Sequence, residues 1–286
     1  MPARAMTVDD VDLAVELINR EGWGHTRIDL ERILSLSPES NYVWESNGVA
    51  RGFLTSVVYE RTATVAHVLV SKESRGRQIG KNLVKTLLEK LDADGIRSAI
   101  LYATEDGARL YRKYGFETVG EMLSVGLYVR GSEMRGLECE CLSVEDGDIS
   151  EVVEIDRATF GDGRGELIAR LCREFPEHCY KLERDGDLAG FALGRRTPIG
   201  FDIGPWICTT GSDRDAGALL ASVISSFPAG GRVDLYPFRD HPGAKKVLSR
   251  YRHYKTAETV GLMVRGEPLY ASCRESVFSV AGFELG

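Results

Sequence analysis

The sequence lacks several features that would indicate a membrane, a metal or nucleic acid. No apolar run approaches the roughly 20 residues of a membrane-spanning helix, and the start, "MPARAMTVDD", has no signal-peptide core. Basic residues do not dominate, since the formal net charge is -7, which argues against broad nucleic-acid binding. The six cysteines form no CxxC pair and no zinc-type spacing. We therefore expect a cytoplasmic protein with free thiols, no metal, and no membrane or nucleic-acid partner.

The chain is long enough for two domains. It has 286 residues, of which 43% are hydrophobic and 28% are charged, as in ordinary globular proteins. Each half of such a chain can bury a core of its own.

Three pairs of similar segments recur in the same order. "MTVDDVDLAVEL" resembles "LSVEDGDISEVV", "NGVARGFL" resembles "DGDLAGFA", and "VGLYVRG" resembles "VGLMVRG". The paired anchors are Thr7 with Ser143, Gly48 with Gly186, and Val125 with Val260, at offsets of 136, 138 and 135. Collinear matches at nearly one offset predict two copies of one domain, with the boundary near Ser132 to Arg135. We assign the domains to residues 1–133 and 134–286.

Each copy has the pattern of an α+β domain. Thr7 with Asp10, and Ser143 with Asp146, are spaced as helix caps. Asn47-Gly48 and Asp185-Gly186 predict hairpins. The leucines of "KNLVKTLLEKLDADG" recur at helical spacing, and Gly95 ends that helix. The expected fold is a mixed, mostly antiparallel sheet flanked by helices in each copy.

The stretch "HVLVSKESRGRQIGKNLV" joins an apolar strand to a helix through a glycine-containing turn. A helix N-terminus offers unpaired N–H groups and partial positive charge, and glycines allow close approach of a phosphate. Arg75, Arg77 and Lys81 add charge-assisted donors. The turn thus predicts a diphosphate site, the plain alternative being a helix start with solvated cations.

Two common phosphate motifs do not fit this turn. A Walker loop needs four residues between its first glycine and Gly-Lys-Ser/Thr, whereas only three separate Gly76 from Gly80, and Asn82 replaces the hydroxyl. The G-x-G-x-x-G spacing of dinucleotide-binding folds is also missing.

Further along the chain stands "ATEDGARLYRKYGF". Together with the glycine turn, and in this order, it resembles the GNAT superfamily of acyl-CoA N-acyltransferases. The resemblance implies acetyl-CoA as co-substrate and no metal. It also implies that the strand before the turn pairs with the pantetheine arm, and that Tyr111 is the general acid for the leaving thiolate. The implied cofactor-binding residues are Val68, Leu69, Val70, Arg75, Gly76, Arg77, Gln78, Ile79, Gly80, Lys81 and Thr104.

This sequence departs from the family pattern at two positions. Gln78 replaces a customary glycine, which is tolerable if its φ is negative, and Thr104 replaces a frequent asparagine. Tyr114 is a nearby alternative to Tyr111. Glu60 and His67 flank the relevant strands, but we assign no general base. The segment "EGWGHTRID" is the expected acceptor wall, with Trp23 as a candidate acceptor contact.

The second copy is expected to have lost the chemistry. Offsets of 136 to 137 place Tyr111 on Val247 or Leu248. A uniform offset of 137 places Gly80 on Gly217, so the helix start is kept. The same offset places Arg75 on Ser212, Gly76 on Asp213 and Gln78 on Asp215. Carboxylates at this position oppose a pyrophosphate. The chain resembles the tandem-GNAT group, in which a working domain is joined to a degenerate one that binds no coenzyme A.

The predicted function is N-acetyl transfer from acetyl-CoA to a primary amine of a small molecule or peptide, by direct attack. Two alternatives remain, a non-catalytic acyl-CoA-binding regulatory protein and a transferase of a larger acyl group, which pocket depth near Leu69 would decide. The sequence leaves the acceptor's identity, the role of the second copy and the oligomeric state open.

Overall fold

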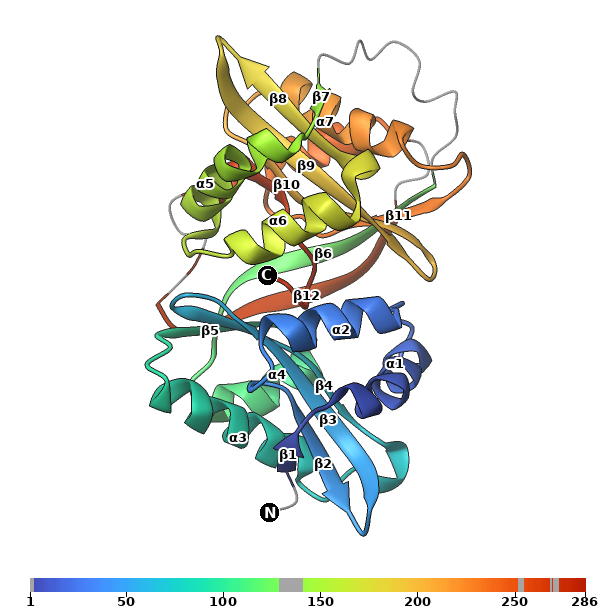
Figure 1. Cartoon of the computed structure of the whole chain (residues 1–286), viewed down its shortest axis with the longest axis vertical. Coiled ribbons are helices and arrows are strands. Elements are labelled where there is room, and N and C mark those ends of the chain that lie inside the picture. The colour runs from blue at the N-terminus through green and yellow to red at the C-terminus, as the bar shows by residue number, and fades with distance from the viewer. Residues whose placement is uncertain (1–2, 129–140, 252–254, 268, 270–272) are drawn as a thin grey trace. The chain divides into compact units, whose positions relative to one another are not determined.

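The computed structural model of the chain describes residues 3–128, 141–251, 255–267, 269 and 273–286 (Figure 1). Contacts divide the chain into two compact units. The first comprises Met1–Thr118, Met263–Glu267 and Glu284–Gly286, and the second comprises Val119–Leu262 and Pro268–Phe283. The boundary expected near Ser132 lies outside the described residues. In this division the continuous part of the first unit ends at Thr118, and two short segments near the C-terminus also belong to this unit.

The first unit begins with a short strand and two helices, continues through a run of strands, and closes with two more helices. Its elements are β1 (Ala3–Ala5), η1 (Val8–Asp10), α1 (Val11–Arg20), α2 (Arg27–Leu36), β2 (Tyr42–Ser46), β3 (Val49–Val58), β4 (Thr62–Val70), η2 (Lys72–Ser74), α3 (Ile79–Ala93), β5 (Ser98–Ala103), α4 (Glu105–Tyr111) and η3 (Arg112–Tyr114). The sheet order is β1-β2-β3-β4-β5, followed by the end of β12. Neighbours from β1 to β4 are antiparallel, and β4 and β5 are parallel, which confirms the predicted mixed sheet.

Local signals in the sequence account for the turns and helix ends of this unit. Asn47 and Gly48 have φ of 54° and 71°, the left-handed pair that a two-residue hairpin requires. Asp10 completes a capping box with Thr7. Gly95, with φ of 75°, follows the C-cap of α3. The predictions at these positions are confirmed.

The core of the first unit has two parts, one on each face of the sheet. Successive residues of β3 point to opposite faces, so Leu54 packs with the apolar face of α3, while Phe53 packs with α1 and α2. Met263 belongs to the α3 cluster. The returning strand segment therefore completes the core on that face.

The second unit repeats the same order of elements. It contains β6 (Glu117–Tyr128, from Val119 on), β7 (Leu142–Ser143), η4 (Asp146–Asp148), α5 (Ile149–Phe160), α6 (Gly165–Glu174), η5 (Pro176–His178), β8 (Cys179–Arg184), β9 (Asp187–Thr197), β10 (Gly200–Cys208), α7 (Asp213–Ser225), β11 (Arg232–Leu235), α8 (Pro242–Leu248), β12 (Lys255–Gly266, to Leu262), η6 (Arg274–Ser276) and β13 (Val277–Ser279). The hairpin at Asp185-Gly186 is confirmed by φ of 56° and 92°. The cap predicted at Ser143 is wrong, because Glu145 caps this helix start with Asp148. Ser143 instead pairs in β7 with Tyr180 of β8.

In the described ranges, no helix combines the length and apolar character needed to cross a bilayer.

Candidate active site

The parallel strands β4 and β5 part from each other in the first unit. Their pairing runs from Thr62 opposite Ser98 to Thr64 opposite Ile100, although β4 continues to Val70. Beyond Thr64, the described residues show no pairing between β4 and β5. We call this stretch of β4 its free edge. Backbone N–H and C=O groups on such an edge can pair with an extended ligand.

A bulge interrupts β4 within this free edge. Phe53 faces Leu69 and Thr55 faces Ala66, so β4 holds one more residue than β3 between these pairs. His67 lies in the bulge with φ of 49°, a left-handed conformation that a non-glycine residue rarely adopts. Bulges bend a strand and re-aim its side chains.

The turn after β4 contains two left-handed residues. Gly76 has φ of 79°, and Gln78, the N-cap of α3, has φ of 63°. The condition expected at Gln78, a negative φ, is not met, because the chain turns into α3 through this residue. A side chain in this conformation costs about 1–2 kcal/mol relative to glycine.

The start of α3 lies directly against the end of β4. A Cβ placed on Gly80 would lie 3.6 Å from Cγ1 of Val68 and 3.7 Å from Cγ2 of Val70. Ile79 is buried at the first position of the helix. Leu69 is buried on the opposite side of β4, in the cluster formed with α1. The unpaired N–H groups of the 15-residue helix α3 are therefore at the same end of β4 as its free edge.

Three exposed cations surround this helix start. Arg77 and Lys81 are exposed. Arg75 donates through Nε to the carbonyl oxygen of Val70 at 3.3 Å and forms an ion pair through Nη2 with Glu21 Oε1 at 3.0 Å. These contacts hold Arg75 near the turn while most of its side chain remains in solvent.

A pocket of about 310 Å³ opens beside the turn. It is bounded by the end of α1, the end of β4 and the loop that follows. The lining residues are Leu17, Arg20, Glu21, Leu69, Val70, Ser71, Lys72, Glu73 and Arg75. Several predicted cofactor residues thus share one open cavity.

Tyr111 and Tyr114 differ in the bonding of their hydroxyl groups. Tyr111, the last residue of α4, packs its ring 6.0 Å from that of Phe116, and burial raises its pKa to about 12. Among the described residues, its hydroxyl has no hydrogen-bond partner. The hydroxyl of Tyr114 donates to the carbonyl oxygen of Lys81 at 2.9 Å. Tyr114 therefore ties η3 to α3, and the Tyr111 hydroxyl is available to a ligand.

Thr104 caps α4 at the end of β5. Its Oγ1 accepts a hydrogen bond from the backbone N–H of Gly107 at 3.4 Å, and the residue is exposed. The cap uses Oγ1 as an acceptor, so the hydroxyl hydrogen can still be donated to a ligand.

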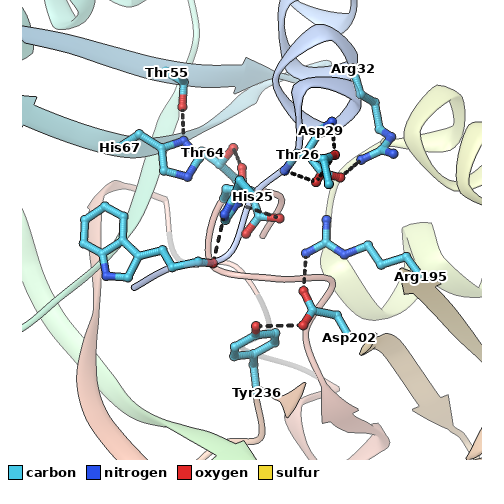
Figure 2. Close-up of polar contacts among 12 residues, drawn as sticks. His25, Thr26, Asp29, Arg32, Thr55, Thr64, His67, Arg195, Asp202 and Tyr236 are labelled. Atoms are coloured by element: carbon cyan, nitrogen blue, oxygen red, sulfur yellow. Dashed lines mark hydrogen bonds and ion pairs between the residues drawn. The ribbon is translucent and has the colours of Figure 1, made fainter. Parts of the chain in front are cut away.

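The loop between α1 and α2 places two aromatic rings next to the bulge. Trp23 is 47% exposed, and its ring centroid lies 6.1 Å from that of His67. The His25 ring meets His67 edge-on at 4.6 Å. Figure 2 shows His25 beside His67, whose Nδ1 lies 2.7 Å from the Thr55 hydroxyl. Glu60, the other residue considered for a base, is exposed just after β3.

The corresponding turn of the second unit is much shorter. Seven residues separate Val70 from the N-cap Gln78, but three separate Cys208 from the N-cap Ser212. The uniform offset used above is therefore wrong at this turn, because Ser212 takes the position of Gln78 rather than that of Arg75.

The first turn of α7 carries two carboxylates. Asp213 forms an ion pair with Lys246. Asp215 is buried, and its carboxylate contacts Arg184 at 2.5 Å and the Thr210 hydroxyl at 2.9 Å. The predicted carboxylates are thus at this helix start, but they lie within α7 and not in a preceding loop.

At the position equivalent to Tyr111, the second unit has no tyrosine. Leu248 is the last residue of α8, as Tyr111 is of α4, and it is buried in the core. Leu248 is one of the two residues predicted for this position.

In the described ranges, His, Cys, Asp and Glu side chains form no group of three or more that could hold a metal ion.

Comparison with known proteins identifies both units. Residues 11–116 match the model of the acetyltransferase (GNAT) family, and residues 152–279 match that of an acetyltransferase (GNAT) domain. An uncharacterized N-acetyltransferase of Bacillus subtilis is 28% identical over 60% of this chain, a match that spans 58% of the relative's length. An acetyltransferase of Pectobacterium atrosepticum is 29% identical over 42% of this chain and 89% of its own.

Solved structures share the fold. A crystal structure from Pyrococcus horikoshii superimposes with a TM-score of 0.83 at 21% identity, over 99% of this chain and 95% of its own. A tandem GNAT protein from the clavulanic acid biosynthesis pathway gives a TM-score of 0.61 at 15% identity, over 93% and 98%.

The chain belongs to the GNAT family of acetyltransferases and contains two GNAT-fold domains in tandem. Members of this family use an acyl-CoA as co-substrate, and their acceptors are small molecules or peptides. The predicted family and fold class are confirmed.

Proposed function

We propose that the protein transfers an acetyl group from acetyl-CoA to a primary amine of a small molecule or peptide, and that the first unit carries the site. One observation supports this above the others. The free edge of β4, the N-terminus of α3 and the exposed cationic turn all lie at the same end of the sheet. An extended chain ending in a diphosphate fits such an arrangement.

In this proposal the cofactor follows β4 toward the turn. Backbone groups of Val68, Leu69 and Val70 pair with the pantetheine arm, and the hydroxyl of Thr104, which directly follows β5, bonds it. The pyrophosphate rests on the turn and on the start of α3. The turn residues in this role are Arg75, Gly76, Arg77, Gln78, Ile79, Gly80 and Lys81.

The chemistry is direct attack of a neutral amine on the thioester carbon. Negative charge that develops on the carbonyl oxygen is stabilised by a preset backbone N–H of β4. Tyr111 donates its proton toward the leaving sulfur. Burial keeps this tyrosine neutral, with its pKa raised to about 12. The same dry surroundings disfavour a free thiolate, so donation to sulfur is favoured where both groups are buried.

We further propose that the second unit binds no coenzyme A. Its turn is four residues shorter than that of the first unit. The carboxylates of Asp213 and Asp215 already occupy the first turn of α7. A diphosphate at this place would meet like charge and would lack the loop that surrounds it in the first unit.

Calorimetric titration with acetyl-CoA tests the proposal. The wild-type chain is compared with an Arg75→Glu, Gly76→Asp variant, and with Arg109→Glu as a control that reverses an exposed charge on α4. We expect one site per chain, which the double variant loses and the control keeps. Two sites per chain would contradict the proposal that the second unit binds no coenzyme A. An absence of binding would contradict the proposed function.

A further inference from the structure

A buried polar cluster in the first unit remains outside the cofactor site. It contains His67 of the β4 bulge, His25 of the loop between α1 and α2, and Glu284. The side chain of Glu284 is 7% exposed, and its Oε1 lies 3.7 Å from Nε2 of His25. His67 is likewise buried and is directly followed by Val68, the first residue proposed to pair with the cofactor.

The segment Glu284–Gly286 is held in the first unit by two hydrogen bonds to its backbone. The hydroxyl of Tyr59 donates to the carbonyl oxygen of Leu285 at 2.6 Å. The hydroxyl of Thr64 donates to that of Glu284 at 3.0 Å. Tyr59 directly follows β3, and Thr64 lies near the start of β4. A carboxylate from a distant part of the sequence is thereby fixed beside His25.

Hydrogen bonds indicate which ring nitrogen of each histidine carries a hydrogen. Nδ1 of His25 lies 3.0 Å from the carbonyl oxygen of Trp23, which can only accept, so Nδ1 carries a hydrogen. Nε2 of His25 then faces the carboxylate. Nδ1 of His67 lies 2.7 Å from Thr55 Oγ1. If this nitrogen donates, Nε2 of His67 holds the lone pair that can accept a proton.

The charge of the cluster also favours proton uptake. With both imidazoles neutral and Glu284 ionised, the buried cluster has one net negative charge. One added proton makes it neutral overall. A buried net charge is costly, so Glu284 stabilises an imidazolium at this place.

We propose that His67 is the general base that takes the proton of the acceptor amine, and that Glu284, through His25, is a positioning residue that stabilises the resulting positive charge. The inference rests on the proposed acetyl transfer. In this proposal the amine approaches over the exposed Trp23, whose ring lies 6.1 Å from that of His67.

The acceptor's ammonium loses one proton to Nε2 of His67, and the neutral amine attacks the thioester carbon. The C–N bond forms and the C–S bond breaks. Sulfur takes the proton of the Tyr111 hydroxyl, and the second proton that leaves nitrogen restores that hydroxyl. The products are the amide, coenzyme A and a protonated cluster, which returns its proton to solvent.

The test measures thiol release from acetyl-CoA with a panel of amines: spermidine, lysine, glucosamine, tryptamine and a short peptide. His67→Ala is expected to lower kcat by about 100-fold or more, to bind acetyl-CoA as the wild type does, and to regain activity with added imidazole. Glu284→Gln is expected to lower kcat by roughly 10-fold, with cofactor binding unchanged.

His178→Ala is the matched control. His178 is a buried histidine of the second unit, with Nδ1 2.8 Å from the Ser226 hydroxyl, the same kind of pair as His67 with Thr55. We expect no imidazole rescue there. Activity of His67→Ala within threefold of wild type, or a loss that imidazole does not restore while acetyl-CoA still binds, would overturn the inference. If the wild-type chain acetylates no amine, that result would instead contradict the proposed function, and with it this inference.

Discussion

Replacement of Tyr111 by phenylalanine removes one hydroxyl and leaves the ring in place. The ring packs against Phe116, and no described protein group bonds the hydroxyl, so we expect the free energy of unfolding to change by less than about 1 kcal/mol. Loss of a general acid lowers kcat by about 10² to 10⁴, or roughly 3–5 kcal/mol in the barrier. Steady-state thiol release and calorimetric binding of acetyl-CoA measure the two effects separately.

Tyr114→Phe is the control for this change. It lies three residues further on and loses its hydrogen bond to the Lys81 carbonyl. We expect it to lose about 0.5–1.5 kcal/mol of stability and to keep kcat within a few-fold. The reasoning on Tyr111 is refuted if Tyr111→Phe retains wild-type kcat, or if it loses acetyl-CoA binding together with turnover.

The raised pKa of Tyr111 also predicts how the free energy of unfolding changes with pH. An unfolded tyrosine ionises near pH 10, whereas the folded one holds its proton to about 12. The contribution to stability is complete below pH 10 and is lost as the pH rises from 10 to 12. Urea unfolding at pH 9 and 11 should therefore show a smaller loss for Tyr111→Phe than for the wild type.

Three further predictions concern the backbone and the second unit. In Gly52→Ala, the new Cβ would lie 2.7 Å from the Leu69 carbonyl oxygen, so we expect weaker acetyl-CoA binding and a lower melting temperature. The equivalent Gly190→Ala, 2.6 Å from the Ile207 oxygen, should lower the melting temperature alone, and equal effects on binding would contradict the assignment of the site. Gln78→Gly, at a φ of 63°, should change the free energy of unfolding by less than about 1 kcal/mol, because relief of backbone strain offsets the added freedom of the unfolded chain. Gln78→Val should lower the free energy of unfolding by more than this. Asp156→Ala leaves the buried Arg164 without the partner that it contacts at 2.8 Å, and should destabilise the second unit by about 3–5 kcal/mol in denaturant unfolding.

Features that depend on neighbouring residues were predictable from the sequence. Asn47-Gly48 specifies its hairpin through the only conformation that such a turn allows. The leucines of α3 specify its buried face. The repeat was visible because the same local patterns recur in the same order.

Features that depend on distant residues were not predictable in this way. Nothing in the local pattern of Met263–Glu267 indicates that it belongs with residues of the first half of the chain. The uniform offset failed at the turn before α7, because a loop can shorten without changing the strand and helix beside it. Glu284 was missed for the same reason, since its role depends on a segment more than 200 residues away from His25.

The same division of the chain sets an order of events during synthesis. Residues 1–118 leave the ribosome first, but Met263–Glu267 and Glu284–Gly286 are made later, by roughly 10 to 30 s at ordinary translation rates. Until they arrive, β5 has an open edge and the α3 cluster lacks Met263. A fragment that ends at Thr118 should therefore aggregate through that edge. In the full chain, the first unit to be translated is the last to be finished.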